Sequence, residues 1–428
     1  MTQVPYTSFE LATLHVGVLP DRGLDIMSAM RVVIADKFPE NYLLEFRSFG
    51  LDVEYHPDCS AAQLPEVARD CEILVVRSTK VTRETIEAAR GLELVIRAGA
   101  GIDTIDVEAA SARGIYVTNC PGKNSVAVAE LAVGLILALD RRIPQNTADL
   151  RAGRWNKKEY SKADGLKGKT LGLVGLGSIG QAVARRAAAF EMHLVAYTRS
   201  PHLELAQSLG IVPCASLFEL AQRSDVVSVH VPGTPANRGL FGEEFFSHMK
   251  HGASFVNTSR GSLHDTAALE KAMRERGLRA GLDVYNPEPE GGAGPFEHPL
   301  CKLPGFVGTH HIGASTEQAQ NAIAAEAVRI CREFIKMGQP QNAVNIGRAS
   351  PARVQLIVRH FDQVGVLASV LAIVRKYGLN VEEMTNTIFA GAKAAVATIR
   401  LASAPPDAMA EEILNLKDQI IQVTVKPC

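Results

Sequence analysis

The stretch that decides the fold of this 428-residue chain is Thr170-Leu171-Gly172-Leu173-Val174-Gly175-Leu176-Gly177-Ser178-Ile179-Gly180. Its first five residues are typical of a buried strand, and the residues after it favour a helix. Between them, the first glycine allows a tight turn, the second lets the backbone approach a pyrophosphate, and the third permits close packing of helix on strand. In this context the pattern predicts a dinucleotide-binding loop made of Gly175, Gly177, Ser178, Ile179 and Gly180.

The end of the next expected strand bears on the choice of dinucleotide. An NAD site usually has a carboxylate there, which accepts hydrogen bonds from the ribose hydroxyls. This chain has Thr198, Arg199 and Ser200 instead. A guanidinium between two hydroxyls suits a 2′-phosphate, because arginine makes charge-assisted, bidentate contacts to phosphate. We therefore predict NADP use, and the alternative is NAD binding with Arg199 in solvent.

The rest of the chain predicts an α/β protein with a third, smaller domain. Short apolar runs alternate with amphipathic segments before and after residues 125–152, which indicates two doubly wound parallel sheets. Residues 125–152 themselves should be helical, with a break at Pro144. After a linker-like stretch at 338–350, the predicted order is βαββαβ, a ferredoxin-like arrangement. Residues 1–29 carry no clear signal.

Composition excludes several classes of protein. Charged residues make up 21% and the net charge is −1 without a basic run, which argues against a nucleic-acid partner. The longest apolar run, residues 131–139, is too short to cross a membrane. The seven cysteines are scattered and lack the spacing of a zinc site. We therefore expect a cytoplasmic protein with no membrane segment and no metal.

Three further blocks each follow an expected strand: Asn257-Thr258-Ser259-Arg260-Gly261, residues 281–289, and His310-His311-Ile312-Gly313-Ala314-Ser315-Thr316. Together with the glycine loop they resemble the D-isomer-specific 2-hydroxyacid dehydrogenases, over nearly all of residues 31–340. The resemblance implies a flavodoxin-like substrate-binding domain formed by residues 30–125 and 315–340. It also implies a Rossmann NAD(P)-binding domain formed by residues 126–314.

The resemblance assigns three catalytic residues. Arg260 should bind the α-carboxylate of the substrate, His311 should exchange its hydroxyl proton, and Glu288 should hydrogen-bond the imidazole. The chemistry agrees, because alcohol oxidation needs a base and imidazole titrates near working pH, while arginine matches a carboxylate bidentately. The family usually has proline where His310 stands, so two histidines are candidates. His311 is favoured as the base over His310, because it directly precedes Ile312.

The resemblance and the loop chemistry add further contacts. Backbone N–H groups of Gly99, Ala100 and Gly101 could complete the anion site around Arg260. By resemblance, Asp283 contacts the nicotinamide carboxamide. The predicted cofactor contacts outside the glycine loop and residues 198–200 are therefore Ala100, Thr258, Ser259 and Asp283.

Residues 76–82, 141–145 and 153–155 look most like the 3-phosphoglycerate dehydrogenases within the family. A distal phosphate would need cations, which Arg77 and Lys80 supply, with Arg141 from the connecting helix or a neighbouring subunit. The predicted substrate contacts are Arg77, Ser78, Lys80, Gly99, Gly101, Asn124 and Arg141. We expect a phosphorylated hydroxy acid as substrate and a homodimer or homotetramer. The alternatives are an NADPH-dependent hydroxypyruvate/glyoxylate reductase and, from another class, a non-catalytic NAD(H)-sensing corepressor.

Residues 351–428 resemble an ACT domain, a βαββαβ regulatory module that often binds amino acids between paired copies. Relatives that respond to serine carry a His-x-Asn pair, whereas this chain has His360-Phe361-Asp362. A carboxylate in place of the amide would face the carboxylate of the effector. We therefore expect weak or absent serine binding at His360 and Asp362.

Overall fold

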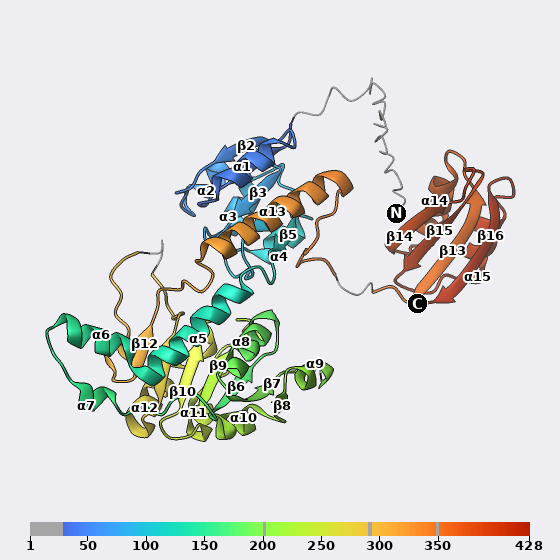
Figure 1. Cartoon of the computed structure of the whole chain (residues 1–428). Helices are drawn as coiled ribbons and strands as arrows, with labels where there is room; N and C mark the ends of the chain where they lie inside the picture. The colour runs from blue at the N-terminus through green and yellow to red at the C-terminus, as the bar shows by residue number, and fades with distance from the viewer. Residues whose placement is uncertain (1–28, 200–202, 290–292, 348–350) are drawn as a thin grey trace, which may run out of the picture. The chain divides into compact units, whose positions relative to one another are not determined.

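The computed structural model describes residues 29–199, 203–289, 293–347 and 351–428 (Figure 1). The chain forms two compact units, Met1–Asn345 and Ile346–Cys428. The first unit contains two sheets in which every strand pair is parallel, and the second contains one antiparallel sheet. The α/β class and the presence of a third, smaller sheet are therefore confirmed.

The first sheet has the strand order β2-β1-β3-β4-β5, which is the flavodoxin-like order. Its strands are β1(Arg31–Ile34), β2(Asp52–Tyr55), β3(Ile73–Val76), β4(Leu94–Arg97) and β5(Tyr116–Asn119). Its helices are α1(Glu40–Arg47), α2(Leu64–Val67), α3(Arg83–Ala88), α4(Val107–Ala112) and α13(Glu317–Met337). Although α13 comes much later in the chain, it packs on α1 and β4, and its apolar face joins the same core. The chain thus leaves this domain after β5 and returns to it with α13 (Figure 1).

The second sheet has the order β12-β11-β10-β9-β6-β7-β8, the Rossmann order with one added strand. Its strands are β6(Thr170–Val174), β7(His193–Tyr197), β8(Ile211–Pro213), β9(Val226–Val229), β10(Ser254–Asn257), β11(Arg279–Leu282) and β12(Phe306–Gly308). The helices among them are α8(Ser178–Ala189), α9(Leu203–Ser208), α10(Leu217–Arg223), α11(Glu243–His248) and α12(Thr266–Arg276), with short 3₁₀ helices at Pro235–Asn237, Gly261–Leu263 and Pro299–Lys302. The sequence pattern missed β8, a three-residue edge strand that ends in proline.

The connecting helix breaks two residues earlier than predicted. Helix α5(Ser125–Arg141) ends at Arg142, whose φ of 51° is left-handed, and α6(Ile143–Arg151) begins immediately afterwards. Pro144 lies in the first turn of α6, where its missing N–H removes no intrahelical bond. Proline therefore starts the second helix and does not interrupt it. A short helix, α7(Lys157–Tyr160), follows.

The second unit has the predicted βαββαβ order, with the sheet order β14-β15-β13-β16 and antiparallel neighbours throughout. Its elements are β13(Val354–Phe361), α14(Val366–Lys376), β14(Val381–Ile388), β15(Ala394–Leu401), α15(Asp407–Leu414) and β16(Ile420–Pro427). Alternate residues of β13 and β15 are buried with the apolar faces of α14 and α15. This strand order is that of ferredoxin-like domains.

No helix in the described ranges combines the length and the apolar character that crossing a membrane requires. Within the same ranges, no three His, Cys, Asp or Glu side chains gather as a metal ion would require.

Charged and polar side chains around the buried carboxylate of Glu326 hold the segment through which the chain leaves the first domain. Glu326 of α13 is only 5% exposed and accepts hydrogen bonds from Arg329 Nε (3.0 Å) and Nη2 (2.6 Å) and from Asn342 Nδ2 (2.9 Å). Lys123, in the crossover between β5 and α5, lies 3.2 Å from the same carboxylate. The hydrogen bonds from Arg329 and Lys123 outweigh burial and lower the pKa of Glu326 to about 2.

We predict that Glu326→Gln lowers the free energy of unfolding by about 2–3 kcal/mol at neutral pH. The folded-state pKa lies below the ordinary value of 4.5. The carboxylate therefore stabilises the fold fully above that value and loses its contribution as pH falls towards about 2. Denaturant titrations of both proteins at decreasing pH should show the difference shrinking across this window. A difference that does not change with pH would contradict the prediction.

Candidate active site

The glycine loop has the space and the strain that a bound pyrophosphate requires. Gly175 has a φ of 97°, and a Cβ there would lie 2.7 Å from the carbonyl oxygen of His230. A Cβ on Gly180 would collide with the Gly175 carbonyl. Gly177, by contrast, caps the N-terminus of α8, and a Cβ built there meets nothing within 4 Å. The backbone is therefore open to a ligand at the helix N-terminus, where Ser178 and Ile179 begin α8, and the loop fits a dinucleotide.

The residues after β7 lie where the adenosine ribose of a dinucleotide would bind. Thr198 is half-buried and Arg199 is exposed, while Ser200 lies outside the described residues. The segment Thr198–Arg199 contains no carboxylate. The structure therefore leaves the prediction of a 2′-phosphate contact open.

A histidine and a glutamate from different loops form a hydrogen-bonded pair. His311 Nδ1 and Glu288 Oε2 are 2.7 Å apart, and the other Glu288 oxygen accepts from the Tyr285 N–H at 3.0 Å. Burial opposes the charged form of Glu288, but the bonds from His311 and Tyr285 outweigh it and lower the pKa of this carboxyl. With Nδ1 held by the carboxylate, Nε2 is the nitrogen available to a substrate.

The loop that carries this histidine is fixed by Asp283, which is 1% exposed. Its carboxylate accepts from Thr309 Oγ1 at 2.6 Å and from the N–H groups of Ile312 and Gly313, each at 2.9 Å. These bonds hold His311 in a left-handed conformation with φ of 53°. Asp283 thus positions the candidate base, and its predicted contact to the carboxamide stays a prediction.

The neighbouring histidine has different surroundings. His310 is exposed, and the structure gives its ring no hydrogen bond to the described residues. Only His311 of the two has a carboxylate partner in the described structure. The geometry therefore supports His311 as the base.

Arg260 joins the two parallel-sheet domains. Its Nε donates to Asp103 Oδ2 at 2.6 Å, and Nη1 donates to the Ser259 carbonyl at 2.7 Å. A Cβ on Gly101 would collide with Arg260 Nη2, so the guanidinium lies directly on the loop after β4. Asp103 was not among the residues predicted from the sequence. The ion pair brings the predicted substrate-anion loop of one domain to the arginine of the other.

A second arginine, which sequence reasoning missed, lies beside this loop. A Cβ on Gly99 would collide with the guanidinium of Arg97, and Arg97 Nε is buried without a hydrogen-bond partner. Burial and then the charge of Arg260 lower the pKa of Arg97 to about 10, while Asp103 opposes the shift. Arg77 also contributes to this lowering, so the three arginines lie close enough to interact. No local motif marks Arg97, because its burial arises only when the sheet and its loops are assembled.

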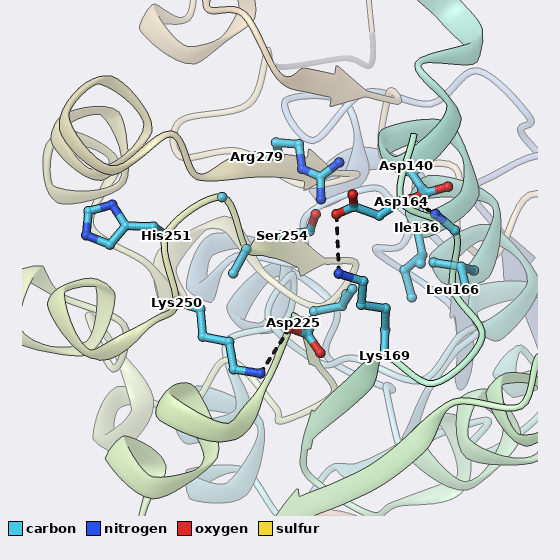
Figure 2. Close-up of a pocket in the computed structure, with 14 residues that line it drawn as sticks. Ile136, Asp140, Asp164, Leu166, Lys169, Asp225, Lys250, His251, Ser254 and Arg279 are labelled. Atoms are coloured by element: carbon cyan, nitrogen blue, oxygen red, sulfur yellow. Dashed lines mark hydrogen bonds and ion pairs between the residues drawn. The ribbon is translucent and has the colours of Figure 1, made fainter. Parts of the chain in front are cut away.

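Arg141 lies near the amino ends of the strands of the second sheet, at the opposite end from the glycine loop and His311. Its neighbour Asp140 lines a surface pocket with Ser254 and Arg279, the first residues of β10 and β11 (Figure 2). The site above is built at the carboxyl ends of these strands. Within one chain, therefore, the structure does not bring Arg141 to Arg77, and that contact would require a neighbouring subunit.

The other predicted residues differ in their burial and in their hydrogen-bond partners. Ser259 Oγ donates to the Val229 carbonyl at 2.9 Å, and Thr258 Oγ1 is buried without a partner. Asn124 caps α5 with its Oδ1 buried and also unpartnered. Ser78 and Lys80 are exposed on the loop after β3, and Ala100 accepts from Asn119 Nδ2 at 2.6 Å. The orphaned oxygens of Thr258 and Asn124 are consistent with polar groups that await a ligand.

In the second unit, the predicted effector residues differ in accessibility. His360 is 2% exposed, with Nδ1 2.8 Å from the Phe361 carbonyl and Nε2 3.1 Å from Asn386 Oδ1. Both ring nitrogens are therefore engaged within the module. Asp362 is half-buried at the turn that follows β13.

These features of the first unit define a class of protein, the two-domain dehydrogenases. In this class two α/β domains bring a glycine-rich dinucleotide loop, a His–Glu pair and an arginine to the carboxyl ends of their strands. Residues 133–313 match the domain described as "D-isomer specific 2-hydroxyacid dehydrogenase, NAD binding domain". The hydroxypyruvate reductase of Thermotoga maritima is 43% identical over 269 residues, which cover 62% of this chain and 85% of that protein. The chain belongs to the D-isomer-specific 2-hydroxyacid dehydrogenase family.

Two further comparisons agree with this membership. The D-3-phosphoglycerate dehydrogenase of Methanocaldococcus jannaschii is 41% identical over 319 residues, which cover 74% of this chain. The match spans 60% of the length of that protein. The crystal structure of the TT0316 protein from Thermus thermophilus matches with a TM-score of 0.67 at 38% identity, over 74% of this chain and 100% of that one.

We predict that His311→Ala lowers turnover by a factor on the order of 10²–10⁴, because a positioned acid–base group is lost. Dinucleotide binding, measured by fluorescence titration of the reduced cofactor, should survive, since His311 lies outside the glycine loop. His310→Ala is the matched control and should stay near the unaltered rate. A crippled His310→Ala together with a mild His311→Ala would reverse the assignment of the base.

Proposed function

We propose that this protein is a D-3-phosphoglycerate dehydrogenase, which oxidises 3-phospho-D-glycerate to 3-phosphohydroxypyruvate with NAD or NADP in L-serine biosynthesis. The observation that carries the proposal is the group of three arginines in which Arg97 interacts with both Arg77 and Arg260, while Asp103 pairs with Arg260. One guanidinium suffices for the α-carboxylate of a hydroxy acid. The additional cations suit a substrate with a second anionic group. The name of the Methanocaldococcus jannaschii relative supports the same substrate.

The residues divide the reaction between them. Arg260, held by Asp103 through Nε, keeps Nη2 for the α-carboxylate. His311 Nε2 accepts the proton of the C2 hydroxyl, and Glu288 stabilises the imidazolium that forms. The bound nicotinamide supplies the hydride acceptor. In the reverse direction, the same imidazolium returns the proton to the carbonyl oxygen.

The second candidate is a hydroxypyruvate or glyoxylate reductase that uses NADPH. It is supported by the name of the Thermotoga maritima relative and by Thr198 and Arg199, which stand where an NAD site has a carboxylate. A non-catalytic corepressor is less favoured, because the His311–Glu288 pair and Arg260 are all in place. The arginine cluster favours the phosphorylated substrate over both.

We further infer the division of labour among the domains. Residues 30–125 with 315–340 would bind substrate, residues 126–314 would bind NAD(P), and residues 351–428 would form an ACT regulatory module. The sheet order of the second unit supports the last assignment. Because His360 is buried and engaged with Asn386, we expect weak serine binding there. A cytoplasmic location also remains our prediction.

We infer a homodimer or homotetramer from apolar side chains on the α6–α7 segment. Ile143 and Leu150 are half-exposed, and Trp155, the only tryptophan of the chain, is 81% exposed. Apolar groups of this size on one segment are typical of a surface that another chain covers. Packing of two copies there would remove them from water.

We predict that 3-phosphoglycerate is used far better than D-glycerate, and that Arg77→Ala weakens the phosphorylated substrate selectively. A charge-assisted contact contributes roughly 1.5–3 kcal/mol, which corresponds to a rise in KM of about tenfold or more. Steady-state kinetics with both substrates measure the difference. Equal efficiency with D-glycerate, glyoxylate or hydroxypyruvate would favour the reductase.

We predict measurable activity with NADP(H), reduced more by Arg199→Ala than the activity with NAD(H). Thr198→Asp should shift the preference towards NAD(H), because the new carboxylate repels the 2′-phosphate and accepts from the ribose. Parallel assays with both dinucleotides provide the measurement. Strict NAD dependence of the unaltered enzyme would show that Arg199 faces solvent.

A further inference from the structure

An aspartate occupies the point where the strand order of the first sheet reverses. Asp36 follows β1, from which the chain continues to β2 on one side, whereas from the neighbouring β3 it continues to β4 on the other side. Asp36 Oδ2 accepts from three successive backbone N–H groups of the loop after β3, those of Arg77 (2.6 Å), Ser78 (3.0 Å) and Thr79 (3.1 Å). The same loop is fastened by Thr79 Oγ1, which donates to the Ala35 carbonyl at 3.2 Å.

Three consecutive N–H groups that converge on one oxygen form an anion-binding concavity, or nest. Doubly wound sheets bind their ligands at this topological switch point, outside the carboxyl ends of the strands. Here, however, the chain fills the nest with its own carboxylate. The backbone of residues 77–79 is therefore committed to Asp36, and recognition of any substrate group beside this loop must come from side chains.

We propose that Asp36 is a positioning residue that determines substrate specificity: its carboxylate occupies the nest at residues 77–79 and so sets the backbone from which Arg77 and Lys80 reach the distal phosphate. This inference rests on the proposed function for the identity of the substrate. Without the carboxylate, the three N–H groups would lose a common acceptor and the loop would become free to rearrange. An external anion could then enter the empty nest.

The loop is connected to the reacting centre. Arg77 is near enough to Arg97 for its charge to lower the Arg97 pKa, and Arg97 in turn interacts with Arg260. A displaced loop would move Arg77 within this cluster. The effect should therefore be felt by a substrate with a second anionic group and much less by one that has only the α-carboxylate.

The first test measures the nest without any substrate. Asp36→Ala removes the carboxylate, and formate is the probe because it replaces the missing group. We expect formate to raise the melting temperature of Asp36→Ala in a saturable way, since a ligand that binds only the folded state stabilises it. Formate should not do this for the unaltered protein. Asp36→Asn, which keeps the shape and one acceptor oxygen, should fold even if the alanine variant does not, and should melt lower than the unaltered protein without a response to formate.

The second test measures specificity. Asp36→Ala should raise KM for the phosphorylated substrate roughly tenfold or more and KM for the unphosphorylated acid less than about threefold, because the lost bonds are charge-assisted. Formate should restore the first value. Asp58→Ala is the matched control, because Asp58 follows β2 at the same edge, is 84% exposed and lies 3.8 Å from Lys37. It should change neither KM nor the response to formate.

The outcomes separate this inference from the proposed function. If the unaltered protein does not use phosphorylated hydroxy acids, the proposed function fails, and the formate shift still decides whether the nest exists. A missing formate shift in Asp36→Ala overturns the nest. A formate shift together with equal KM changes for both substrates overturns the role in specificity and leaves Asp36 a purely structural residue.

Discussion

The functional site depends on one constraint, the parallel direction of the strands in both large sheets. In a parallel sheet the loops that follow the strands all lie at the same end of the sheet. Side chains that are far apart in the sequence therefore come close together there. In the first sheet this end carries Asp36, Arg77 and Arg97, and in the second it carries Gly175, Arg260 and His311. The Arg260–Asp103 ion pair then joins these two ends. Each assigned role follows from this placement.

Four carboxylates fix side chains or loops of the site. Asp283 fixes the loop of His311, Glu288 orients its ring, Asp103 binds Arg260, and Asp36 holds the backbone at Arg77. An acid within hydrogen-bond reach fixes a long side chain or a loop before the substrate arrives, which lowers the entropic cost of binding. It also offsets part of the repulsion among the three arginines. The remaining positive charge is available to an anionic substrate.

The features that sequence alone could predict are those encoded locally. The glycine loop rests on a short motif with its own chemical requirement, and the order of the elements rests on the pattern of apolar residues. Arg260, Glu288 and His311 were assigned through short blocks that resemble those of a known family. Arg97 and Asp103 escaped prediction because their roles arise when separate loops meet. The connecting helix breaks at Arg142 because proline is tolerated in a first helical turn, a choice that the pattern leaves open. Likewise, His360 Nε2 is engaged by Asn386, which lies 26 residues away in the chain.

The roles assigned to His311 and Arg260 require that the C2–H bond of a D-2-hydroxy acid breaks beside the His311 imidazole. The most direct measurement is single-turnover formation of reduced nicotinamide, followed by its near-ultraviolet absorbance, with 3-phospho-D-glycerate carrying either hydrogen or deuterium at C2. The predicted result is a slower rate with the deuterated substrate and deuterium recovered on the nicotinamide ring. Reduced nicotinamide that forms without deuterium, or no reduction with any D-2-hydroxy acid, would contradict hydride transfer from C2 at this site.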